Sequence, residues 1–283
     1  MKFIVAMKES GMLLREFLSQ QELSKKAVKL IKMHGKILVN GQRQTVRYCL
    51  RYGDVVELLW PEEVSTMEPY PLALKICYED ENFLVIDKPA GLPSIPTKRY
   101  PRNTLANAVV YYYQSQGIKA TVHLVNRLDK DTQGLLLIAK NSYAHYLLSR
   151  DIKQVRRVYH CVVEGVLTGQ GTITAPIIKD KKSVKRLIHP AGKFAVTHYR
   201  GLEVSANQSK IECILETGRT HQIRVHLSSI NHPLVGDTLY DSIYQESYYL
   251  DSIALSFIDP FTQRLIEVKK DSKQFEKNQN DSS

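Results

Sequence analysis

The chain has 283 residues, enough for one large domain and one small domain, each with its own core. Its net charge of +10, from 39 basic and 29 acidic residues, favours a polyanionic partner, nucleic acid first, over a merely solvated basic surface. There is no bilayer-length apolar run, no secretory signal and no paired cysteine spacing, so we expect a reduced, cytoplasmic protein without a Cys-x-x-Cys metal site.

Residues 1–60 hold 11 basic and 5 acidic residues, so about a fifth of the chain carries +6 of the net charge. Apolar residues at helical spacing predict two short helices. The residues are Leu13, Leu14, Phe17 and Leu18 in the first helix and Ala27, Val28, Leu30 and Ile31 in the second. Ser24 has the side chain of an N-cap for the second helix. The outer face of that helix would offer a row of charges to a phosphate backbone, from Lys25, Lys26, Lys29 and Lys32.

A β-hairpin is predicted next, from the apolar run Lys36–Val39, the pair Asn40-Gly41 and a strand at Val55–Leu59. The run from Gly35 to Gly41, followed by Leu-Arg-Tyr-Gly-Asp at 50–54, resembles the small S-four-type RNA-binding domain. The resemblance covers residues 11–60. It implies that the helical pair and the adjoining loop grip structured RNA, and Arg43 is counted with the lysines as an expected RNA-binding residue.

Three prolines mark residues 61–74 as a linker between this domain and a second one at residues 75–270. Strands are predicted at 83–86, 135–139, 158–164, 195–204 and 210–216, and a Lys-rich loop or RNA-facing edge at 179–186. Helices are predicted at 104–116, capped by Thr104, at 141–150, capped by Asn141 or Ser142, and after Gly218. We therefore expect an α+β domain with a mixed, largely antiparallel sheet. The polar tail, 271–283, is expected to be disordered.

The segment 123–140 combines a charged turn with an apolar run, Leu135–Ala139, that reads as a strand buried on both faces. Such a strand would hold the turn, with Arg127, Asp129 and Asp131, rigidly at the rim of the sheet. A carboxylate beside a guanidinium is expected to stay ionised, because the positive charge lowers its pKa, and could then act as nucleophile or general base. From these residues alone the simpler interpretation is preferred, in which Asp129 caps a turn and Arg224 makes a surface ion pair.

Several motifs occur in a fixed order across residues 75–260. They are Lys88–Gly91, Asn126-Arg-Leu-Asp129 with Thr132 and Gly134, Arg157-Val-Tyr159, Thr217–His226, His232-Pro233 and Gly236-Asp237. Together they resemble the RluA/RluD-type pseudouridine synthases, whose signature is His-Arg-Leu-Asp, two variable residues, Thr-Ser-Gly and an apolar strand. The resemblance implies a pseudouridine synthase catalytic domain preceded by a small α/β RNA-binding domain.

By this resemblance Asp129 is the catalytic aspartate, Tyr159 packs on the target base and Arg224 pairs with the aspartate. Arg127 would displace the flipped nucleotide, since a carboxylate cannot reach the sugar–base bond of a stacked uridine. Arg219 is a further expected RNA contact. The implied reaction breaks the N1–C1′ bond, rotates the uracil and rejoins it through C5, with no cofactor or metal. Attack of the aspartate on C1′ and abstraction of a C2′ proton are both open.

The sequence departs from the family pattern at four places. Asn126 replaces the usual His, Gln133 replaces Ser, Arg157 replaces Lys, and Asp251 stands where His is common. These changes leave the three catalytic positions intact and bear on target choice and loop geometry.

Two alternatives remain: a non-catalytic RNA-binding or ribosome-assembly factor on the same fold, and a nucleic-acid hydrolase that uses Asp129, Asp131 and a metal. Asp131 is expected to face solvent. His221 and His226 lie five apart, a spacing that does not suit a zinc pair on one helical face, so we expect structural or RNA-contacting roles. The expected partner is ribosomal RNA rather than transfer RNA, with no membrane, and the expected state is a monomer.

Overall fold

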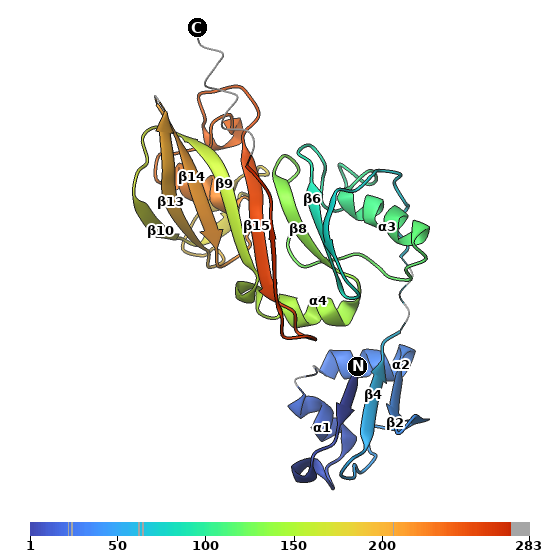
Figure 1. Ribbon diagram of the computed structural model, residues 1–283. Coiled ribbons are helices and arrows are strands. Elements are labelled where there is room, and N and C mark those ends of the chain that lie inside the picture. The colour runs from blue at the N-terminus through green and yellow to red at the C-terminus, as the bar shows by residue number, and fades with distance from the viewer. Residues whose placement is uncertain (22, 24, 62, 64, 206, 273–283) are drawn as a thin grey trace. The chain divides into compact units, whose positions relative to one another are not determined.

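The computed structural model describes residues 1–272 except positions 22, 24, 62, 64 and 206, and it contains two compact units, 1–64 and 65–283 (Figure 1). The predicted N-cap Ser24 and the tail from position 273 onward lie outside the described residues, as does the side chain of Lys26. Within the described part, no helix is both long enough and apolar enough to cross a membrane.

The N-terminal unit is a four-stranded antiparallel sheet with two α-helices, both of them predicted. The strand order is β1-β4-β2-β3. The bounds are Lys2–Ile4 (β1), Met7–Glu9 (the 3-10 helix η1), Leu14–Gln20 (α1), Lys25–His34 (α2), Lys36–Val39 (β2), Gln42–Arg43 (β3) and Val55–Leu59 (β4). Asn40 and Gly41 have φ of 52° and 78°, so both adopt the left-handed backbone of a two-residue hairpin turn, as the sequence predicts. The strand β1, which pairs with β4, was not predicted.

The larger unit contains one ten-stranded sheet, ordered β10-β13-β14-β9-β15-β8-β6-β5, with β16 beside β15 and β7 beside β8. The bounds are Ile76–Glu79 (β5), Phe83–Lys88 (β6), His123–Leu124 (β7), Gln133–Ala139 (β8), Arg156–Glu164 (β9), Gln170–Thr174 (β10), Val196–Ser205 (β13), Gln208–Leu215 (β14), Leu250–Ile258 (β15) and Leu265–Lys269 (β16). Among the described strand pairs of this sheet, β15 with β8 is parallel and the others are antiparallel. This confirms the expected α+β fold with a mixed, largely antiparallel sheet.

Two helices of the larger unit, α3 and α4, begin at the predicted caps. Thr104 caps α3 (Leu105–Ser115), and the Asn141 side chain accepts a 2.8 Å hydrogen bond from the Ala144 amide at the start of α4 (Ser142–Ser149). The remaining elements are Ile152–Gln154 (η2), Gln222–Ser229 (α5), Thr238–Tyr240 (η3) and the two-stranded hairpin Ile177–Lys179 (β11) with Arg186–Ile188 (β12). The predicted Lys-rich segment forms the connection within that hairpin.

Strand β8 is buried on both faces, as predicted, and supports the turn that precedes it. Leu136 and Ile138 pack into one apolar cluster, and Leu135 and Leu137 pack into another. Figure 1 shows β8 beside β15 in the middle of the sheet. Gly134 at its start has a φ of 105°, and a Cβ there would meet the side chain of Asp251 and the backbone of Ser252 on β15. Only glycine allows this backbone and this close approach of the two strands.

Candidate active site

A cavity of about 630 Å³ opens where the turn before β8 faces the start of α5. We call residues 126–133 the Asp129 turn. The cavity is lined by all five residues that the sequence nominated in this unit, namely Arg127, Asp129, Tyr159, Arg219 and Arg224. These come from the Asp129 turn, β9, the loop before α5 and α5 itself, so the fold brings together side chains that lie up to 97 positions apart.

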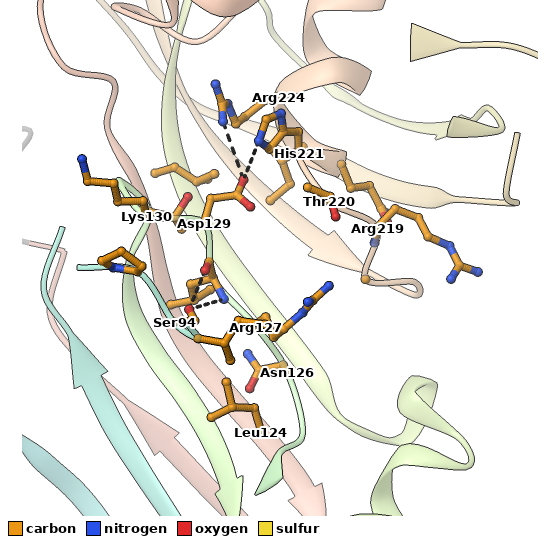
Figure 2. A pocket seen from close by; sticks show the side chains of 18 of the residues that line it. Ser94, Leu124, Asn126, Arg127, Asp129, Lys130, Arg219, Thr220, His221 and Arg224 are labelled. Carbon is orange, nitrogen blue, oxygen red and sulfur yellow. Dashed lines mark hydrogen bonds and ion pairs between the residues drawn. The ribbon is translucent and has the colours of Figure 1, made fainter. Parts of the chain in front are cut away.

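The Asp129 carboxylate lies in this cavity with its side chain 27% exposed. Its Oδ2 atom is 3.7 Å from Nη1 of Arg224 and 3.9 Å from Nε2 of His221. Figure 2 shows both side chains approaching the carboxylate from the side of α5. One oxygen of the carboxylate, Oδ2, therefore has two nitrogen neighbours.

The Asp129 turn is anchored on both sides of its aspartate. Before it, the Ser94 hydroxyl donates a 2.6 Å hydrogen bond to the Leu128 carbonyl and accepts one of 3.3 Å from the Leu128 amide. After it, the ammonium of Lys88 donates to the Lys130 carbonyl at 3.0 Å. Fixed neighbours on both sides limit the movement of the carboxylate, which is what a reacting group requires.

Lys88 is fully buried, and its ammonium also donates to the carbonyls of Pro89 and Leu92, at 2.9 and 2.8 Å. Burial lowers the pKa of Lys88 to about 8, against the opposing charges of Asp131 and Asp129. The Lys-Pro-x-Gly turn is thus joined to the Asp129 turn through one buried cation.

Arg224 is held in place by a second carboxylate. Its Nε and Nη2 donate to the two oxygens of buried Asp237 at 2.6 and 2.7 Å, a bidentate pair. Its guanidinium also lies 4.6 Å from the ring centroid of Tyr248 and 5.0 Å from that of Tyr240. Burial lowers the pKa of Arg224, but the hydrogen bonds to Asp237, together with the charges of Tyr248, Asp237 and Asp129, exceed this effect and raise the pKa above its ordinary value.

Burial raises the pKa of Asp129 above its ordinary value, and the positive charges of Arg224, Lys88, Arg127 and Arg186 oppose this rise. The guanidinium of Arg224 lowers the pKa of this carboxyl, as expected, but burial has the larger effect and the net direction is upward. The reason is that desolvation of a carboxylate in the cavity exceeds the attraction of cations, of which the nearest is 3.7 Å away.

Tyr159 is buried on β9, and burial raises the pKa of its phenol. Asn126, the residue that replaces the family His, is also buried, and its Oδ1 accepts a 2.7 Å hydrogen bond from the Leu137 amide on β8. Arg157 is buried as well and donates to the carbonyls of Val155 and Leu215, each at 3.0 Å. Asn126 and Arg157, which replace the family's His and Lys, thus form hydrogen bonds to backbone groups around the cavity.

The two other departures from the family pattern contact each other. Gln133 and Asp251 are register partners across the parallel β8–β15 pair, and the Gln133 amide donates to Asp251 at 3.0 Å. Lys270 also approaches Asp251, at 3.0 Å. A glutamine and an aspartate therefore replace the usual Ser and His as a bonded pair.

The proposed RNA contacts are exposed. In the larger unit, Arg127 and Arg219 are exposed at the cavity, and Nε of Arg219 donates to the Phe194 carbonyl at 3.0 Å. In the N-terminal unit the nominated basic side chains that the structure describes, Lys25, Lys29, Lys32 and Arg43, are exposed as well. Asp131 is exposed, as expected, and the described residues hold no group of three or more His, Cys, Asp or Glu that could bind a metal ion.

Sequence reasoning missed Lys88, His221 and Asp237 as site residues, although each lies inside a motif that had been recognised. His221 was grouped with His226, and the structure separates the two. His226 is buried and bonded to the Thr197 hydroxyl at 2.9 Å and the Ala175 carbonyl at 3.0 Å. His221 faces Asp129 instead.

The chain is similar to known proteins over most of its length. The sequence model of the RNA pseudouridylate synthase family matches residues 82–229. The uncharacterized RNA pseudouridine synthase YjbO of Bacillus subtilis is 42% identical over 89% of this chain and 92% of its own. The ribosomal large subunit pseudouridine synthase D of Pseudomonas aeruginosa is 46% identical over 60% of this chain and 54% of its own. The solved structure of human RNA pseudouridylate synthase domain containing 1 superimposes with a TM-score of 0.56 at 25% identity, covering 72% of this chain and 86% of that one.

Proposed function

The chain belongs to the RluA/RluD-type family of RNA pseudouridine synthases, and we propose that it isomerises specific uridines of large-subunit ribosomal RNA with Asp129 as its catalytic residue and without a cofactor. The choice of ribosomal over transfer RNA is supported by similarity to synthases that are named for the large ribosomal subunit. We place the reaction in the cytoplasm and assign it to a monomer.

The position of Asp129 supports this role most directly. Its carboxylate is part of the cavity wall, beside Arg224 and between two anchored neighbours, so a nucleotide in the cavity would meet a fixed carboxylate. Tyr159 lines the same cavity and offers an aromatic face to the uracil. Arg127, exposed at the cavity, is the side chain that would occupy the space left in the RNA when the uridine is flipped out.

The reaction that these groups would carry out is balanced without an outside oxidant or reductant. The N1–C1′ bond breaks, the uracil rotates, and a new bond joins C5 to C1′. The proton on C5 leaves and N1 gains one, so substrate and product have the same composition. Asp129 would supply a carboxylate oxygen to the reacting nucleotide. Arg224, which is held by Asp237, lies beside the other oxygen, Oδ2, and would stabilise its negative charge.

The N-terminal unit is proposed to hold the RNA. Its helix α2 exposes Lys25, Lys29 and Lys32, and β3 exposes Arg43, so the described surface offers several cations to phosphates. Contacts to phosphates position RNA without reading its sequence. Target choice would then come from the shape of the RNA and from the cavity.

Pseudouridine mapping in RNA from cells that lack this protein tests the proposal. We expect one or a few uridines of large-subunit ribosomal RNA to lose the modification and to regain it when the wild-type gene is restored. No loss in any RNA would favour a non-catalytic factor, and loss in transfer RNA alone would overturn the ribosomal assignment. The purified protein should retain activity with a chelator present, since loss there would contradict the cofactor-free reaction.

A further inference from the structure

His221 lies beside the catalytic carboxylate in an unusual backbone conformation. It is the N-cap residue of α5, with φ 57° and ψ 22°, in the left-handed region that residues other than glycine rarely adopt. Its side chain is 13% exposed. Nε2 is 3.9 Å from Oδ2 of Asp129, and Nδ1 is 2.9 Å from the phenolic oxygen of Tyr240. The imidazole therefore connects Tyr240 to Asp129.

The hydrogen bonds of Tyr240 assign the proton on this ring. The amide of Arg186 donates to the Tyr240 oxygen at 2.9 Å, so that oxygen already accepts one hydrogen bond. Tyr240 is 1% exposed, and its own hydrogen needs an acceptor, because an unpaired buried hydroxyl is costly. Nδ1 of His221 is the remaining partner of this oxygen among the described residues. Tyr240 thus donates to Nδ1, and the hydrogen of the neutral ring lies on Nε2, facing Asp129.

Burial and the two neighbouring arginines keep the ring neutral. Arg224 and Arg186 are the cations near it, Asp237 and Asp129 are the carboxylates, and Tyr240 contacts it from η3. Burial first, and then the two arginines, lower the pKa of His221 to about 3, while Asp237 acts in the opposite direction. At neutral pH the imidazole is a hydrogen-bond donor at Nε2 and carries no charge of its own.

We propose that His221 is a positioning residue whose Nε2–H holds Oδ2 of Asp129, so that Oδ1 is directed to the bound nucleotide. The inference rests on the proposed catalytic role of Asp129. At 3.9 Å the contact is longer than a hydrogen bond, and such bonds in active sites commonly shorten when substrate is bound. Arg224 approaches the same oxygen at 3.7 Å, and two donors on one oxygen fix the plane of a carboxylate (Figure 2).

Two substitutions at position 221 distinguish the role of Nε2 from that of Nδ1. In His221→Gln, the amide nitrogen can take the place of Nε2 and donate to Asp129. In His221→Asn, the shorter amide reaches only as far as Nδ1, toward Tyr240, and position 221 no longer presents a donor to Asp129. Asparagine tolerates the left-handed backbone better than most residues, so the variant that lacks the donor is also the one least strained at this position.

The measurement is single-turnover pseudouridine formation with the full-length protein on an RNA that contains a mapped target. We expect His221→Asn to lower the rate constant about a hundredfold with RNA affinity nearly unchanged, and His221→Gln to restore most of it. Equal rates in wild type and His221→Asn would overturn the proposal. Equal loss in the two variants, with wild-type melting temperatures, would also overturn it, because the Nε2 donor would then not be what matters.

A double-mutant cycle with Tyr240→Phe provides a second readout. Without the phenol, Nδ1 loses the donor that keeps its hydrogen on Nε2, so Tyr240→Phe should slow the wild type but add little to His221→Asn. Equal slowing in both backgrounds would show that Tyr240 acts independently and would contradict the proposed connection.

Asp129→Asn separates this inference from the proposed function. If Asp129→Asn turns over RNA, the catalytic assignment fails whatever His221 does. If Asp129→Asn is inactive and His221→Asn is as fast as wild type, only the positioning role fails.

Discussion

Two nitrogens of Arg224 donate hydrogen bonds to Asp237, at 2.6 and 2.7 Å, and the third lies 3.7 Å from Oδ2 of Asp129. The arginine beside Asp129 is thus fixed by a different carboxylate, which is buried and 13 positions further along the chain. A resemblance that pairs Arg224 with Asp129 describes only the weaker of its two contacts.

Asp237→Asn should therefore damage both stability and catalysis. The amide cannot accept both guanidinium hydrogen bonds, and it leaves a buried cation without its counter-charge. Breaking a buried ion pair from one side costs about 3 kcal/mol in the free energy of unfolding. Urea unfolding measures this cost, and single-turnover kinetics at a temperature where the variant stays folded measures the lost positioning of Arg224. A variant as stable as wild type would show that the pair contributes little.

Lys88→Met tests how the buried ammonium that bonds the Asp129 turn contributes to stability. The pKa of Lys88 is lowered to about 8 in the folded protein, against an ordinary 10.5, so between these values the unfolded chain binds more protons. The free energy of unfolding contributed by Lys88 accordingly rises as pH increases through this window, by up to about 3 kcal/mol. Wild type should gain stability over Lys88→Met between pH 7.5 and 10. A difference that stays constant would mean that the folded pKa is not lowered.

Gly134→Ala should unfold or strongly loosen the junction of β8 and β15. A Cβ at this position meets the side chain of Asp251 and the backbone of Ser252, and the φ of 105° adds backbone strain, so we expect a cost of at least about 3 kcal/mol. Gly169→Ala is the matched control. Gly169 has a φ of 74° with nothing near its missing Cβ, and should cost only about 1 kcal/mol. Similar melting temperatures for the two variants would contradict the close approach of these strands.

Replacing Lys25, Lys29 and Lys32 by alanine tests the RNA-binding role of the N-terminal unit. These side chains are exposed, so the fold should be unaffected. If each contacts a phosphate, affinity should fall and the slope of log K against log salt should decrease by about one for each lysine. Filter binding at several salt concentrations measures the slope. An unchanged slope would remove α2 from the RNA interface.

Local signals predicted the elements that depend on local interactions. Asn40-Gly41 specified a hairpin turn, and Thr104 and Asn141 specified helix starts, because each acts on backbone groups a few residues away. Strand β15 was missed because its pattern is broken by Asp251 and Ser252, two buried polar residues. The place of Asp251 in the sheet is understood only with its partners Gln133 and Lys270.

The residues of the site were predictable where a sequence motif assigns a role to a residue. The five nominated residues of the larger unit meet in one cavity, but sequence could not show that Lys88 and His221 face the Asp129 turn, since side-chain direction follows from tertiary packing. The effect of burial on the pKa of Asp129 was not foreseen for the same reason. A neighbouring arginine can be inferred from a motif, whereas the extent of burial that raises the pKa cannot.

The most direct test of the central claim is single-turnover pseudouridine formation by Asp129→Asn on an RNA with a mapped target uridine. The substitution keeps the size of the side chain and removes its negative charge, and the anchors at Leu128 and Lys130 are untouched. We expect a folded protein that binds the RNA as wild type does and forms no pseudouridine. Turnover by this variant at an appreciable fraction of the wild-type rate would contradict the assignment of Asp129 as the catalytic residue.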